Sequence, residues 1–168
     1  MKQDDDLMMA KQQHDYEVGS IFCVPLRDGG YAKGIVARCD HRGLVFGYFF
    51  GPRTQSESEC VHAGDLKPED AILLGQFGDI GLKNGEWRLT GSVEPWNPDE
   101  WPMPAFSSPA DDATMVTITD YDDNTLNTKS VRTVPQSEET AKLPVDRVMG
   151  YGSVEIRLTR LLEVPQES

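Results

Sequence analysis

The sequence is poor in basic residues, and this deficit argues against several classes of partner. Its 16 Lys and Arg stand against 28 Asp and Glu, which gives a formal net charge of -12 at pH 7. Such a charge opposes binding to nucleic acid phosphates and to anionic membrane surfaces, so we expect neither. A partner with a basic surface is favoured instead, although many proteins are acidic for solubility alone.

Cysteine is scarce, and no long apolar run is present. Cys23, Cys39 and Cys60 are odd in number and well separated, and we expect reduced, partly buried thiols in a cytosolic protein. No segment approaches the length of a membrane-spanning helix, and residues 1–6 lack the apolar core of a secretory signal. These absences predict a cytoplasmic protein.

Catalytic and metal-binding signatures are also missing. His14, His41 and His62 are spread along the chain, and none belongs to a His-Glu-x-x-His or Cys-x-x-Cys spacing. Neither a Gly-x-Ser-x-Gly elbow nor a phosphate-binding glycine-rich loop is present. We therefore predict a non-enzyme with no catalytic residue, metal or cofactor. The alternative is a small enzyme or ligand-binding β-barrel whose cleft uses Cys60, His62 and a carboxylate.

A β-meander pattern occupies residues 19–50. Three runs rich in β-branched and aromatic residues are separated by two short turns that carry Asp and Gly, at residues 27–30 and 40–43. Gly34 interrupts the second run, which indicates a sharp bend or a close backbone approach. Strands that coil in this way form small barrels.

The rest of the chain adds strands and one helix. Further strands are predicted at residues 71–77, 86–91, 114–120 and 128–134. The apolar residues of 153–162 fit either a strand or a helix, and we favour a helix capped by Ser153 because the helical register accounts for the whole apolar set. The predicted fold class is mainly β: an antiparallel meander forming a small, strongly bent sheet or partly open barrel, with one C-terminal helix.

The domain organisation is predicted to be simple. Residues 1–18 form a polar, flexible lead-in, residues 19–163 a single β-rich domain and residues 164–168 a tail. A chain of this length can bury enough apolar surface for one domain without a disulfide or a metal.

Residues 89–128 contain no Lys or Arg but many acidic residues. The Pro-rich part at 95–106 is unsuited to a helix or a sheet ladder and holds two Trp and a Phe. Aromatic side chains in an acidic loop supply contact area and charge, which suits a basic protein partner. The residues predicted to contact it are Trp96, Asp99, Glu100, Trp101, Phe106, Asp111, Asp112, Asp122 and Asp123. The alternative is that the three aromatic side chains fold back and cover an end of the barrel.

Two other roles are open to these carboxylates. The pairs Asp111–Asp112 and Asp122–Asp123 could bind a divalent cation or act as acid and base, but adjacent side chains point apart and flank turns. A row of carboxylates could also mimic nucleic acid on the phosphate-binding surface of a nuclease.

Three parts of the chain carry a family resemblance: GSIFCVPL with DGGYAKGIV within residues 19–36, FGDIGLKNGEW at 77–87 and YGSVEIRL at 151–158. They look like the immunity protein 26 family of bacterial polymorphic toxin systems, and the resemblance extends over most of residues 19–162. It implies a small, mainly β, non-enzymatic protein, encoded beside a toxin, that binds and neutralises the toxin in the cytoplasm. No catalytic residue comes with the family.

The predicted function is therefore that of a toxin-neutralising immunity protein, whose partner is a cognate toxin with a basic surface. A structural interaction module that acts without any toxin is a further alternative, and only the neighbouring genes would separate the two.

Overall fold

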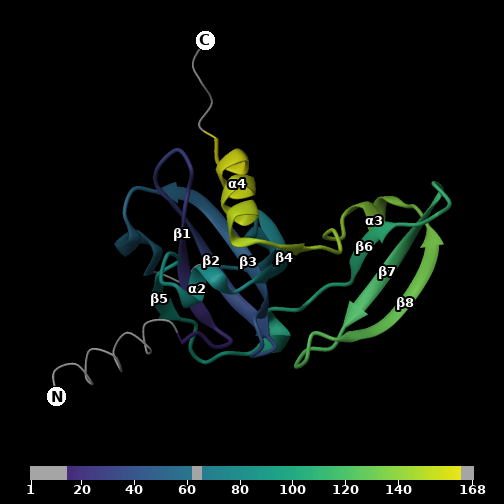
Figure 1. Ribbon diagram of the computed structural model, residues 1–168, viewed down its shortest axis with the longest axis horizontal. Helices are drawn as coiled ribbons and strands as arrows, with labels where there is room; N and C mark the ends of the chain where they lie inside the picture. The colour runs from purple at the N-terminus through teal and green to yellow at the C-terminus, as the bar shows by residue number, and fades with distance from the viewer. Residues whose placement is uncertain (1–14, 62–65, 164–168) are drawn as a thin grey trace, which may run out of the picture.

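Two β-sheets of unequal size make up the structure (Figure 1). The computed structural model describes residues 15–61 and 66–163. The larger sheet has the strand order β5-β1-β2-β3-β4-β9 and the smaller one the order β6-β7-β8. The edge strands of the larger sheet, β5 and β9, do not pair with each other in the described part of the chain. The larger sheet is therefore open rather than closed into a barrel. The mainly β fold class is confirmed.

The predicted meander forms the centre of the larger sheet. Strands β1 (Ser20–Pro25), β2 (Tyr31–Cys39) and β3 (Leu44–Thr54) pair antiparallel, and Phe22 lies opposite Gly34. A Cβ atom on Gly34 would lie 2.3 Å from Phe22 Cζ, so only glycine lets this ring cover β2. The close approach at Gly34 is therefore made by an aromatic ring rather than by backbone.

Shorter elements complete the two sheets. The remaining strands are β4 (Leu73–Gly78), β5 (Leu89–Ser92), β6 (Phe106–Pro109), β7 (Met115–Tyr121), β8 (Thr128–Pro135) and β9 (Val148–Met149). The helical elements are η1 (Glu57–Val61), η2 (Pro68–Asp70), α2 (Ile80–Lys83), η3 (Pro98–Glu100), α3 (Glu138–Ala141) and α4 (Tyr151–Leu161). Strand β9 pairs parallel with β4.

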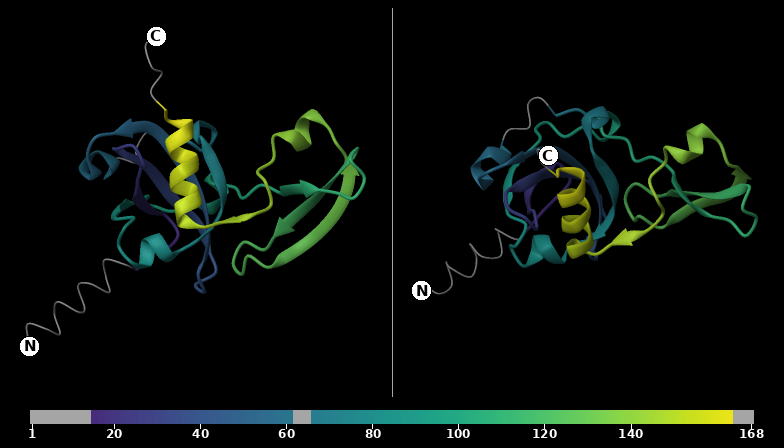
Figure 2. Two further views of the ribbon diagram at one scale, coloured as in Figure 1. Left: turned by 45° about the horizontal axis from the view of Figure 1, so that its top comes forward. Right: turned by 90° about the horizontal axis from the view of Figure 1, so that it is seen from above.

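Helix α4 packs against one face of the larger sheet. Val154 and Leu158 are fully buried in an apolar cluster with rings from the sheet, and Figure 2 shows the sheet curving past the helix. Trp87 Nε1 donates to Glu155 Oε2 at 2.9 Å, and Arg27 lies 3.1 Å from Glu155 Oε1. The buried carboxylate keeps polar partners on both oxygens, as its removal from water requires.

The C-terminal apolar segment is helical, as the helical spacing of its apolar residues predicted. The predicted cap is wrong, however: the helix begins at Tyr151 with Gly150 as N-cap, and Ser153 lies inside the first turn. The Tyr151 ring packs edge-on against Trp87, with centroids 6.4 Å apart. This contact with the core fixes where the helix begins, because tertiary packing stabilises a helix more than a single cap does.

The opposite face of the larger sheet joins the smaller sheet. Phe106, at the start of β6, meets Phe46 of β3 edge-to-face at 5.9 Å, and Tyr121 packs on Phe106 at 5.5 Å. Successive residues of a strand point to opposite faces, which is why Phe46 and Phe49 of β3 belong to different apolar clusters. Strand β8 is exposed along almost its whole length and lies at the outer side of the molecule (Figure 1).

The described end of the predicted lead-in packs on the larger sheet. Tyr16 is half-buried, and its hydroxyl donates to Asp79 Oδ2 at 2.6 Å. Residues 1–14 of the lead-in and the tail at 164–168 lie outside the described residues. The division of the chain into lead-in, domain and tail stays a prediction.

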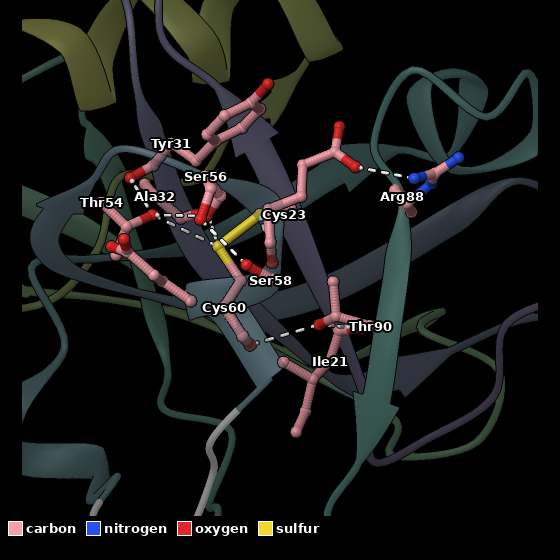
Figure 3. Close-up of a disulfide and its surroundings, with 12 residues drawn as sticks. Ile21, Cys23, Tyr31, Ala32, Thr54, Ser56, Ser58, Cys60, Arg88 and Thr90 are labelled. Atoms are coloured by element: carbon pink, nitrogen blue, oxygen red, sulfur yellow. Dashed lines mark hydrogen bonds and ion pairs between the residues drawn. A yellow bond between two sulfur atoms is a disulfide. The ribbon is translucent and has the colours of Figure 1, made fainter.

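A disulfide joins Cys23 of β1 to Cys60 of η1 (Figure 3), so the expectation of reduced thiols is wrong for these two residues. Their Cα atoms are 6.0 Å apart, within the range that a disulfide bridges. Thr90 Oγ1 also donates to the Cys60 carbonyl at 3.2 Å. Cys39 is the free, buried cysteine. The spacing of the cysteines in the sequence does not predict this pairing, because the path of the loop before η1 determines which strand Cys60 contacts.

Reduction of this disulfide should destabilise the fold. The cross-link spans 37 residues, and closing a loop of that length removes unfolded-state entropy that corresponds to about 3–4 kcal/mol. We expect dithiothreitol to lower the free energy of unfolding in urea by about that amount. A Cys23→Ala/Cys60→Ala variant is the control, since its stability should not respond to reductant; equal stability of the native chain with and without reductant would contradict the prediction.

Candidate protein-binding surface

The side chain of Arg38 joins three segments that are distant in the sequence. It follows a register shift in the β2–β3 pair and is only 6% exposed. Its Nε donates to Asp123 Oδ1 at 2.8 Å, and Nη1 donates to the Trp101 carbonyl at 3.0 Å. Nη2 donates to the Pro98 carbonyl at 3.3 Å. The acidic loop and the β7–β8 turn are thereby held against the end of β2.

A surface cavity of about 550 Å³ opens beside this guanidinium. Three of the predicted contact residues line it, namely Trp96, Asp99 and Asp123, together with Arg38 and His41. The guanidinium is turned toward oxygens of the protein itself through its three nitrogens. Because Asp123 is paired with Arg38, the carboxylate of Asp99 sets the net charge that this cavity presents, and a cationic group is the ligand it favours.

Trp96 is held rigidly although it is only half-buried. Its ring stacks on Trp101 with centroids 6.1 Å apart and an interplanar angle of 14°. It also covers Gly19, where a Cβ atom would lie 3.3 Å from Trp96 Cε3; Gly19 has a positive φ of 89°, which favours glycine there. An aromatic side chain fixed in this way contributes contact area at small entropic cost on binding.

The acidic side chains beside Trp96 are placed by a single 3-10 turn. Asn97 caps η3, because its Oδ1 accepts from the Asp99 amide at 3.0 Å. Asp99 and Glu100 follow in the first turn and are exposed. The backbone of η3 therefore sets the positions of Asp99 and Glu100. Neither carboxylate forms a salt bridge with another described residue.

Trp101 and Phe106 are buried and do not lie on this surface. Their burial argues against the prediction that they contact a partner directly. Trp101 is 4% exposed and Phe106 0%. Trp101 meets Tyr48 edge-to-face at 5.3 Å, and Tyr48 also donates to the Pro102 carbonyl. The alternative that the aromatic residues fold back applies to these two, because they close the apolar space between the sheets.

The two Asp pairs lie at opposite ends of β7. Asp112 precedes the strand and Asp122 follows it, and seven residues of strand span roughly 23 Å. Each also organises its own turn: Asp112 accepts from the Thr114 amide at 2.8 Å, and Asp122 from the Thr125 amide at 2.9 Å. These hydrogen bonds hold the pKa of both carboxyls below the ordinary value. Only the second pair is near Arg38.

The rival cleft built on Cys60 and His62 loses its nucleophile, because the Cys60 sulfur is bonded to Cys23. His62 and His14 lie outside the described residues. Within the described ranges, no three His, Cys, Asp or Glu residues are grouped as a metal site. His41 approaches the Cys39 sulfur at 3.8 Å, but burial raises the pKa of the Cys39 thiol above its ordinary value, which favours the unreactive thiol.

Comparison with known protein families identifies the family of this chain. The sequence profile described as Immunity protein 26 matches residues 17–113, more than half of the chain. The chain belongs to the immunity protein 26 family. The matched region includes the meander, Arg38, Trp96 and η3 and ends before Asp122. No curated protein and no solved structure matches the chain.

In this immunity protein 26 chain, the two stacked tryptophans should contribute unequally to stability. Trp101→Ala empties a buried site and should cost about 3–5 kcal/mol of unfolding free energy. Trp96→Ala removes a half-buried ring and should cost roughly half of that or less. Urea unfolding followed by circular dichroism measures both, and equal costs would show that Trp96 is a core residue rather than a surface anchor.

The immunity protein should lose stability at high pH through Tyr48. Burial raises the pKa of Tyr48 to about 12, so the folded state holds this proton after the unfolded chain has released it near pH 10. The contribution is fully present below pH 10 and is lost as the pH rises to about 12, by roughly 2–3 kcal/mol. Tyr48→Phe should flatten this part of the pH profile of unfolding; an unchanged slope would contradict the assignment.

Proposed function

We propose that this immunity protein binds and neutralises a cognate bacterial toxin in the cytoplasm, without catalysis. The contact is made by the Trp96 surface, defined as Trp96, Asp99, Glu100, Asp122 and Asp123. The observation that carries the proposal is that Asp123 of the β7–β8 turn lines the same cavity as Trp96 and Asp99 of the acidic loop. Family membership supports the toxin as partner.

The two chemical components of the Trp96 surface have separate roles in this proposal. The fixed indole of Trp96 is the anchor, because buried aromatic contacts account for most of the binding energy at interfaces. The carboxylates raise the association rate for a basic partner, since the chain carries a net charge of -12. A Lys or Arg of the toxin that enters the cavity would meet both Asp99 and the face of an aromatic ring.

The cytoplasmic site of action rests on the family and on the need to block the toxin where it is made. Among the described residues no helix is long and apolar enough to cross a bilayer. The Cys23–Cys60 disulfide is unusual for a reducing compartment. Both cysteines are buried, at 1% and 0% exposure, and burial slows attack by a soluble thiol because exchange requires access to a sulfur.

Kinetics with the toxin encoded by the neighbouring gene test the proposal. Trp96→Ala should accelerate dissociation about 30-fold, the effect of a hot spot of about 2 kcal/mol. Asp99→Lys/Glu100→Lys should instead slow association about tenfold at low salt, and the difference should shrink as salt screens the charges.

The matched control is Asp111→Lys/Glu139→Lys, which makes the same change in net charge at exposed positions in the β6–β7 turn and in α3. It should associate faster than Asp99→Lys/Glu100→Lys under the same conditions. If the control slows association as much or more, the Trp96 surface is not the contact. If the neighbouring toxin neither binds nor is neutralised, the function itself is wrong.

A further inference from the structure

A second cavity, of about 260 Å³, lies beside β4, the strand next to the edge strand β9 of the larger sheet. Leu73 and Leu74 of β4 line it together with Val145 and Met149. Val145 is 50% exposed, and Leu73 and Leu74 are half-buried. We call this cavity the β4 groove. Of these apolar lining residues, Leu73, Leu74 and Val145 are partly exposed, whereas Met149 is buried.

The backbone of β4 is open along part of this groove. On one side β3 pairs with β4 from Leu73 to Gly78. On the other side β9 pairs only with Gln76 and Phe77, so within the described strands Leu73 and Leu74 lack a neighbour there. An unpaired strand edge offers N–H and C=O groups to an incoming extended chain.

The rim of the β4 groove is basic, in contrast to the rest of the molecule. Lys142, Arg147 and Arg157 line it. Six other cationic side chains of the described residues form ion pairs, but these three do not take part in any of them. Three unneutralised cations at one apolar groove are notable in a chain with a net charge of -12. A ligand that supplies carboxylates would complement them.

We propose that the β4 groove binds an extended, acidic segment of another protein by strand addition. The segment pairs its backbone with Leu73 and Leu74, places apolar side chains against Val145 and Met149, and directs carboxylates to the three cations. A polyanion such as nucleic acid fits less well, because the overall negative charge repels it and the groove is apolar. This site is independent of the Trp96 surface, which attracts the opposite charge.

A labelled peptide of alternating valine and glutamate, compared with its valine and lysine counterpart, tests the inference. Fluorescence anisotropy should show that the acidic peptide binds and that binding weakens with salt. Amide chemical shifts of the full chain should move at Leu73 and Leu74 and in residues 142–149. Absence of binding of the acidic peptide at about 1 mM, the weak end of specific association, would overturn the proposal, as would equal shifts at the β4 groove with the lysine peptide or shifts by the acidic peptide confined to other regions.

Charge reversal at the rim provides a second arm of the test. Lys142→Glu/Arg147→Glu/Arg157→Glu should weaken binding about tenfold or more, since three exposed ion pairs are lost together. The matched control, Lys83→Glu/Arg88→Glu/Lys129→Glu, makes the same charge change on other elements and should bind better than the rim variant. Equal loss in both would show that only the net charge matters. If the rim variant or the control variant fails to fold, the amide chemical shifts of the unmodified chain still locate the binding site.

Discussion

The guanidinium of Arg38 is the interaction on which the arrangement of the candidate surface depends. It is buried, and it is neutralised by Asp123 and by carbonyl oxygens of the acidic loop. Removing one partner of such a group leaves a buried charge without compensation, which is far more costly than losing an exposed ion pair. The loop that carries Trp96 and the turn that carries Asp123 therefore stay in register with the end of β2, and the meander positions a surface that it does not itself form.

Within the same acidic, aromatic segment, some side chains stabilise the fold and others are exposed to solvent. Trp101 and Phe106 fill the space between the two sheets, while Trp96 remains half-exposed on top of Trp101. Among the carboxylates, Asp112 and Asp122 hold turns through hydrogen bonds to backbone amides, whereas Asp99 and Glu100 are left exposed to solvent. Because burial follows from the contacts of each side chain, composition alone does not separate the buried aromatic residues of this segment from the exposed ones.

Local patterns predicted the fold better than they predicted the site. The meander, the close approach at Gly34 and the C-terminal helix follow from periodicity and turn residues, which depend on near neighbours in sequence. The burial of Trp101 and the pairing of Cys23 with Cys60 depend on how distant segments meet, and no spacing encodes that. The acidic stretch at 89–128 was visible in the sequence, but Arg38, the residue that organises it, carried no signal because its partners lie some 60 to 85 residues away.

Hydrogen exchange of the backbone amides, measured with and without the cognate toxin, tests most directly whether the Trp96 surface is the contact. The account predicts slower exchange on binding at residues 96–100 and 122–124, with residues 111–114 at the far end of β7 unchanged. Protection that spares residues 96–100 and 122–124 while appearing elsewhere would contradict it.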